Sequence, residues 1–229
     1  MTIPSSSSFT AHERRIINRL TSPAKVQNFL NQLNYNHELP PHGITLRSFR
    51  GVLRTDRAHC LEAVLTAAVI LEQHNYPPLL MSFESADNLD HVIFLYRRAG
   101  RWGSIGRSRD PGLHGRRAVF TSPRALALSY VEPFVDLTGR ITGYAVVDLR
   151  MLKGYNWRLT TTNVWKVERF LIDYPHQPIK SSDRRIDRLR RKYRKFRTRF
   201  PNRKPTDYRG RDRWSKLPAE FSRQEIFEK

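Results

Sequence analysis

The chain has 229 residues, of which 39% are hydrophobic, and its formal net charge is +20 at pH 7. This length supports one sizeable hydrophobic core, and the single cysteine excludes an intramolecular disulfide. The first ten residues (MTIPSSSSFT) lack the basic start and apolar run of a secretory signal, and no apolar stretch is long enough to span a membrane. We therefore expect a cytoplasmic protein without a transmembrane segment.

Most of the positive charge lies near the C-terminus. Residues 180–229 contain 19 of the 41 Lys and Arg residues but only 7 of the 21 Asp and Glu residues, so they contribute +12 of the net charge. A segment of this kind attracts nucleic acid, acidic proteins or anionic membranes, and it also keeps a protein in solution. The sequence predicts a disordered Ser-rich N-terminus at 1–10, a folded domain at 11–179, and a basic C-terminal helix and tail at 180–229.

The folded domain begins with helical patterns. Apolar residues at helical spacing fall within 16–20 and again within 26–33, where Ser22-Pro23 suits the N-cap and first turn. The strongest pattern runs from 57 to 74 and is apolar on most sides, which predicts a helix buried in the core. We expect Thr55 or Asp56 to cap its start, and Asn75 with the following prolines to end it.

Strand patterns follow this helix. Residues 79–84 and 91–97 are rich in apolar and β-branched side chains, and 98–100 form a tight turn into a third strand at 102–107. If the turn centres on Ala99 and Gly100, paired residue numbers sum to 199 and His91 faces Ser108. Side chains alternate with a period of two, so Asp110 then lies on the same face as His91.

The remaining elements complete an α+β pattern. A helix is predicted from Ser122-Pro123 to about residue 130, a strand at 141–149, and a helix at 164–172 capped by Asn163. In the basic tail, apolar residues recur every three or four positions from Ile186 to Phe200, which predicts an arginine-rich helix that Pro201 ends.

The single cysteine offers the clearest chemical signal. Cys60 lies near the start of the core helix, where the helix dipole and unpaired backbone N–H groups favour a thiolate. His91 opens a predicted strand, and Asp110 lies just beyond the end of the next predicted strand. A thiol, an imidazole that acts as base and then acid, and a carboxylate that orients the imidazole are the groups that thiol-dependent acyl transfer requires.

These residues resemble the transglutaminase-like superfamily of papain-fold thiol enzymes, in a member of bacterial type. In that family a helix carries the nucleophilic cysteine at its start, a strand opens with the catalytic histidine, and the next strand carries a tryptophan followed by Asp-Pro. This chain shows Cys60, His91, Trp102 and Asp110-Pro111 in that order, within a resemblance that covers about 23–112. The resemblance implies a papain-like fold with N-terminal helices, a Cys-bearing core helix and an antiparallel sheet.

Three functions remain open from the sequence. The first is thiol-dependent acyl transfer or amide and peptide hydrolysis by Cys60, His91 and Asp110, with a peptide or amide substrate. Because Asp110 follows Trp102 by more residues than is usual in the family, Ser108 is an alternative orienting residue, and a catalytically inactive transglutaminase-like scaffold is the second function. The third is binding of nucleic acid or an acidic partner by residues 180–229.

No cofactor or metal is expected. The other histidines lack the spacing of a zinc site, and the glycines lack the strand-to-helix setting of a nucleotide-binding loop. The sequence leaves the oligomeric state open.

Overall fold

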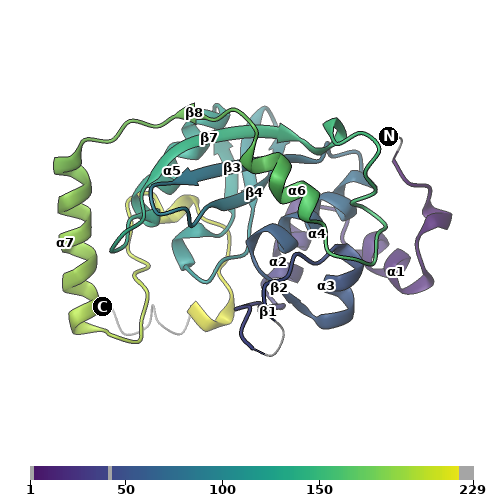
Figure 1. Ribbon diagram of the computed structural model, residues 1–229, viewed down its shortest axis with the longest axis horizontal. Helices are drawn as coiled ribbons and strands as arrows, with labels where there is room; N and C mark the ends of the chain where they lie inside the picture. The colour runs from purple at the N-terminus through teal and green to yellow at the C-terminus, as the bar shows by residue number, and fades with distance from the viewer. Residues whose placement is uncertain (1–2, 41–42, 222–229) are drawn as a thin grey trace.

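The computed structural model describes residues 3–40 and 43–221 and has an α+β architecture, as the sequence predicts. Helices lead and a sheet follows (Figure 1). Four α-helices precede the sheet in the described residues: α1 (Ala11–Arg19), α2 (Pro23–Leu30), α3 (Phe49–Thr55) and α4 (Cys60–Glu72). A short parallel pair, β1 (Asn34–Tyr35) with β2 (Arg57–Ala58), ties the segment after α2 to the segment before α4.

The described residues form one six-stranded antiparallel sheet in the order β6-β5-β4-β3-β7-β8. Its strands are β3 (Leu79–Ser85), β4 (His91–Arg98), β5 (Arg101–Ile105), β6 (Arg116–Phe120), β7 (Ile141–Asp148) and β8 (Gln177–Pro178). Three α-helices accompany or follow them in the described chain: α5 (Pro123–Phe134), α6 (Trp165–Ile172) and α7 (Asp183–Arg199). Short 3-10 helices occur at η1 (Ser6–Ser8), η2 (Pro111–Leu113), η3 (Leu149–Met151) and η4 (Arg211–Arg213).

Both faces of the central strands are buried. Val92 and Phe94 of β4 join the apolar cluster that contains α4, whereas Ile93 and Leu95 join the cluster that contains α5. This division follows from the alternation of side chains along a strand. The sheet is therefore the middle layer, with α4 on one face and α5 on the other.

The hairpin between β4 and β5 has the predicted register. Ala99 and Gly100 form the turn with φ angles of 47° and 74°, and Arg98 pairs with Arg101. The same register continues as far as Phe94 and Ile105, where β5 ends. His91 and Ser108 therefore lie beyond the paired part of the hairpin.

The core helix begins later than expected. Residues 61–72 are all buried, as the apolar pattern predicts, but the N-cap is His59 rather than Thr55 or Asp56. Those two residues end α3 instead, where Thr55 donates to the Gly51 carbonyl and Asp56 adopts a left-handed conformation with φ 52°. The prediction missed α3 because the helical pattern of 49–55 is short and interrupted by Gly51.

Other local predictions also differ from the structure. The N-terminal segment has a 3-10 helix at Ser6–Ser8, and Phe9 is buried against Phe49, so the disorder expected for 1–10 does not describe residues 3–10. The first two residues lie outside the described chain. Asn163 does not cap α6; its side-chain oxygen accepts a hydrogen bond from the Leu46 backbone, and Val164 occupies the cap position.

The basic tail forms α7, a helix that lies at the end of the molecule opposite to the N-terminal helices (Figure 1). Its apolar seam faces the body of the protein: Ile186 is buried, and Leu189, Tyr193 and Phe196 line a small groove shared with Glu132. After α7 the chain returns, and Trp214, Leu217 and Phe221 are buried. Within the described residues, no helix combines the length and apolar character needed to cross a bilayer.

Candidate active site

Cys60 is the first residue of α4 and is partly buried. Three features of the sequence fix the start of this helix. His59 caps it, Glu62 completes the cap from the third helical position, and the apolar residues that follow bury the helix in the core. The positive end of the helix dipole acts on a thiol at this position. The backbone N–H of Cys60 is also one of the donors for which a helix has no internal partner.

His91 is the first residue of β4, and its ring is 5% exposed. The ring stacks on Phe83 with centroids 6.3 Å apart, and it also lies beside Tyr130 of α5. Its Nε2 lies 2.9 Å from the carbonyl oxygen of Leu113. A carbonyl only accepts, so this bond places the proton on Nε2 and leaves Nδ1 available for exchange with a second group.

Both histidines act on the Cys60 thiol. Burial raises the pKa of Cys60, but hydrogen bonds with His59 and His91, together with the charges of the two rings, lower it further, to about 5. The thiol is therefore ionised at neutral pH, and the thiolate is the reactive form of cysteine.

The pKa of His59 changes in the opposite direction to that of Cys60. Burial lowers its pKa, but the hydrogen bond and charge of Cys60, the charge of Glu62 and the Thr45 carbonyl together raise the pKa to about 9. In its neutral form Nδ1 accepts the Leu61 backbone N–H at 3.2 Å, while Nε2 lies 3.0 Å from the Thr45 oxygen. Protonation gives up the helix cap, worth about 1 kcal/mol, in exchange for ion pairing with the thiolate.

Asp110 lines the same cleft as Cys60 and His91, but its carboxylate pairs with basic side chains and not with His91. Its carboxylate is 2.6 Å from Lys204 Nζ and 3.2 Å from Arg109 Nε. The Ser108 hydroxyl accepts a hydrogen bond from the Asp110 backbone at 3.1 Å. In the structure, then, His91 Nε2 contacts the Leu113 carbonyl rather than the Asp110 carboxylate or the Ser108 hydroxyl.

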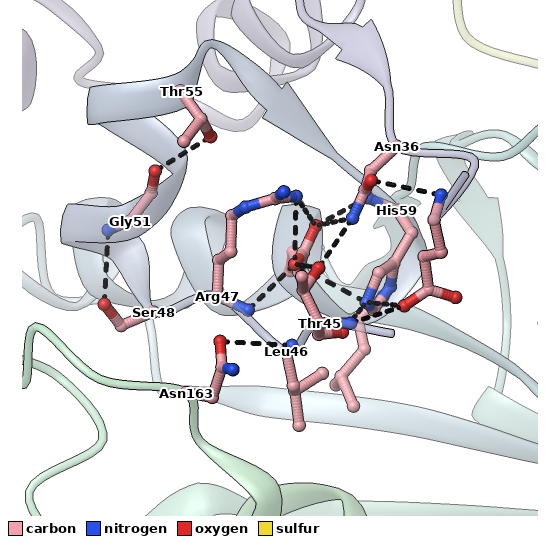
Figure 2. Close-up of polar contacts among 12 residues, drawn as sticks. Asn36, Thr45, Leu46, Arg47, Ser48, Gly51, Thr55, His59 and Asn163 are labelled. Atoms are coloured by element: carbon pink, nitrogen blue, oxygen red, sulfur yellow. Dashed lines mark hydrogen bonds and ion pairs between the residues drawn. The ribbon is translucent and has the colours of Figure 1, made fainter. Parts of the chain in front are cut away.

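A buried carboxylate anchors the loop that contributes Asn36 and Thr45 to the surroundings of Cys60. Glu62 is fully buried, and its oxygens accept hydrogen bonds from Asn36 Nδ2, Thr45 Oγ1 and the backbone N–H groups of Arg47 and His59, at 2.8 to 3.1 Å. Figure 2 shows Asn36, Thr45, Arg47 and His59 converging on one point at the start of the helix. The loop before α3 is thereby fixed against the turn that carries Cys60.

Cys60, His59 and His91 line a cleft of about 430 Å³, which we call the Cys60 cleft. It lies where α4 and β4 begin, so residues from both layers around the sheet contribute to its walls, including Leu61 on one side and Phe134 on the other. Among the described residues, no group of three or more His, Cys, Asp or Glu side chains is arranged to hold a metal ion. The chemistry offered by this cleft is that of an ionised thiol beside an imidazole with one available nitrogen.

Two parts of this site were not predicted from the sequence. Leu113 contacts His91 through its backbone carbonyl, and because every residue has such a carbonyl, the identity of the residue does not predict the contact. The contact of His59 with the thiol did have a signal, because a polar residue three positions before Glu62 is the pattern of a capping box. That pattern locates the start of α4 at Cys60.

No protein-family model matches this sequence, and no curated protein matches it either. The likeness to the transglutaminase-like superfamily therefore rests on the motifs around Cys60, His91 and Asp110 alone.

Proposed function

We propose that the protein is a papain-like thiol enzyme of transglutaminase-like type, which transfers an acyl group or hydrolyses an amide through Cys60. The observation that carries the proposal is the position of Cys60 at the start of α4, in a cleft that it shares with His91, whose ring is oriented by the Leu113 carbonyl. The motif order described above supports the same assignment.

The reaction divides into two steps. The Cys60 sulfur attacks the substrate carbonyl carbon, and the Cys60 N–H stabilises the oxyanion that forms. Protonated His91 then gives its proton to the departing amine as the carbon–nitrogen bond breaks, which leaves a thioester on Cys60. In the second step His91 takes a proton from water or an amine as that group attacks the thioester, and the thiolate is restored.

His91 is the proton carrier in this scheme, and His59 is a positioning residue. In its neutral form His59 has a backbone partner at each ring nitrogen, the Leu61 N–H and the Thr45 carbonyl, whereas His91 has a backbone partner only at Nε2. In its protonated form His59 contributes positive charge beside the thiolate, and in its neutral form it caps the helix that holds Cys60.

The pH dependence of Cys60 alkylation by iodoacetamide tests this proposal. We expect the rate to fall by half near pH 5 and to stay level above it, since only the thiolate reacts. The midpoint is the informative quantity, because a thiolate of low pKa is also intrinsically less nucleophilic and its absolute rate near neutral pH differs little from that of free cysteine. A midpoint near 8.5, the value of free cysteine, would contradict the proposal.

Acylation by p-nitrophenyl acetate tests the chemical step. We expect the native protein to release p-nitrophenol in a burst and to carry one acetyl group on Cys60 by mass spectrometry. The p-nitrophenolate group leaves without a proton, so His91 acts in the second step: His91→Ala removes the base that takes a proton from water and should slow hydrolysis of the acetyl thioester by about 10²–10⁴-fold. His59→Asn keeps a side-chain cap, so it should raise the midpoint of alkylation by about 1–3 pH units while leaving the fold intact. Native protein that shows no burst would favour the inactive scaffold instead.

A further inference from the structure

The Cys60 cleft carries a charge opposite to that of the protein as a whole. Only 21 of the 62 charged residues in the chain are acidic. Among the described residues that line the cleft, however, Arg109 is the one Lys or Arg side chain and His59 adds a second positive charge, against six acidic side chains. The acidic residues are Glu38, Asp87, Asp90, Asp110, Asp136 and Glu168.

Three of these six carboxylates have backbone and hydroxyl partners instead of Lys or Arg. Asp136 accepts the N–H groups of two turn residues, at 3.0 and 2.8 Å, and Asp90 accepts the Ser85 N–H at 2.8 Å. Asp87 accepts from the Ser85 and Thr138 hydroxyls at 2.5 and 2.8 Å. Hydrogen bonds of this kind hold a carboxylate in place without cancelling its charge.

Within the described residues, Asp110 is the one member of the six that forms an ion pair with Lys or Arg. Glu38 lies 3.9 Å from the His59 ring, and Glu168 is exposed on α6. The negative charge therefore comes from Glu38 in the loop before α3, from α6 and from the turns that follow β3, β5 and α5, so carboxylates from several separate segments line the Cys60 cleft.

The same cleft has an exposed apolar rim. Ile44, Leu89 and Ile172 line it, and they are 76%, 54% and 56% exposed. Large apolar side chains left in solvent beside charged ones suit a ligand with an apolar stem and a charged end. Lysine and arginine side chains have that form.

We propose that the substrate of the Cys60 cleft is a peptide segment that carries lysine or arginine side chains beside the reacting carbonyl. This inference rests on the function proposed above and specifies its substrate class. The carboxylates attract the ammonium or guanidinium groups, the apolar rim contacts their stems, and an acidic peptide is repelled.

Binding of short peptides tests the inference directly. Fluorescein-labelled tetralysine and tetraglutamate amides are titrated with Cys60→Ala protein, and fluorescence anisotropy is measured. A protein of net charge +20 would attract tetraglutamate and repel tetralysine if its overall charge decided the outcome. We expect the reverse: tetralysine should bind at least about tenfold more tightly, and the difference should shrink as salt is added.

Matched variants assign the binding to the cleft. The triple variant Asp90→Asn, Asp136→Asn and Glu168→Gln removes three charges while Asn retains the oxygens that accept backbone N–H groups. The control variant replaces Asp173, Asp187 and Asp212 with Asn; these residues are exposed and lie outside the cleft lining. The triple variant should lose most tetralysine affinity and the control little. Equal losses in the two variants, or tighter binding of tetraglutamate by native protein, would overturn the inference.

Charged thiol reagents separate this inference from the proposed function. A methanethiosulfonate bearing trimethylammonium should modify native Cys60 about tenfold faster than one bearing sulfonate at low salt, and the preference should fall in the triple variant. This ratio reports the potential at Cys60 whether or not the protein catalyses a reaction. A preference without acylation by p-nitrophenyl acetate contradicts the enzyme alone, whereas acylation without a preference contradicts the cationic substrate alone.

Discussion

At the scale of single residues, the orientation of His91 depends on a neutral group. The Leu113 carbonyl accepts from Nε2, while the Asp110 carboxylate pairs with Lys204 and Arg109 at the rim. In this arrangement the Cys60 thiolate is the counter-charge for a protonated His91. A catalytic carboxylate bonded to the histidine would instead hold its tautomer and share its charge.

Asp110→Asn is expected to have a small effect for this reason. The midpoint of Cys60 alkylation should move by less than about 0.5 pH unit, and hydrolysis of the acetyl thioester formed from p-nitrophenyl acetate should slow less than about tenfold, compared with about 10⁴-fold when an orienting carboxylate is replaced in a serine protease triad. Rates are measured by stopped-flow across pH 4–9. A loss approaching that of His91→Ala would assign Asp110 to the triad and contradict the role given to Leu113.

The residues of the site differ in how far the sequence could specify them. Cys60 and His91 were predicted as site residues because a thiol near a helix start and a histidine at a strand start carry chemical information in their identity and spacing, and the structure places both in one cleft. The partner of His91 could not be found, because every residue has a carbonyl and its direction depends on the 3-10 turn at Pro111–Leu113. Ser108 and Asp110 lie beyond the paired part of the hairpin, where strand alternation no longer fixes the direction of side chains.

At the scale of elements, the 36–47 loop and the start of α4 are joined by one buried group. Glu62 accepts hydrogen bonds from Asn36, Thr45, Arg47 and His59, and the Arg47 guanidinium lies 3.4 Å from it. The loop forms one wall of the Cys60 cleft, so its position depends on this carboxylate.

Glu62→Gln should lower the free energy of unfolding by about 2–4 kcal/mol. In the variant, an amide NH₂ group replaces one of the carboxylate oxygens, so donors that bond to that oxygen in the native protein lose their acceptor. The Arg47 charge also loses its partner. Urea unfolding followed by tryptophan fluorescence measures the loss, and hydrogen exchange should show faster exchange in the 36–47 loop. Glu168→Gln on the exposed face of α6 is the control and should change stability by less than about 0.5 kcal/mol. Equal stability of the two variants would show that the Glu62 network does not hold the loop.

Elements with a long periodic pattern were predicted well, and those set by distant contacts were not. α4, β3, β4 and the β4–β5 register follow from apolar spacing and from a Gly turn. β6 is a short edge strand that begins with two consecutive arginines, so no alternating apolar pattern indicated it. The start of α6 was misplaced because Asn163 bonds to Leu46, far away in the sequence, and no local rule anticipates such a partner.

At the scale of the whole molecule, the chain after α7 returns to the body of the protein (Figure 1), where Trp214, Leu217 and Phe221 form a buried apolar cluster. The buried guanidinium of Arg116 lies over two aromatic rings, 4.7 Å from the ring centroid of Trp214 and 3.9 Å from that of Tyr130. Arg116 in turn donates to the carbonyls of Gly112 and His114, the two neighbours of Leu113. The C-terminal segment thus supports the turn that orients His91, a connection that a boundary at residue 180 does not suggest.

Trp214→Ala tests this connection. The side chain is 5% exposed, so its loss removes a large buried surface and one of the two aromatic rings beside Arg116, and we expect the free energy of unfolding to fall by about 3–5 kcal/mol. Trp165→Ala is the matched control, because that ring is 42% exposed on α6 and its loss should cost less than about 1 kcal/mol. Hydrogen exchange on the folded variants locates the effect. If the C-terminal segment supports the His91 turn, Trp214→Ala should accelerate exchange at residues 111–116 and leave β3 and β7 protected. Unchanged exchange at 111–116 would show that this turn holds its position without the segment, and that Leu113 orients His91 through the body of the domain alone.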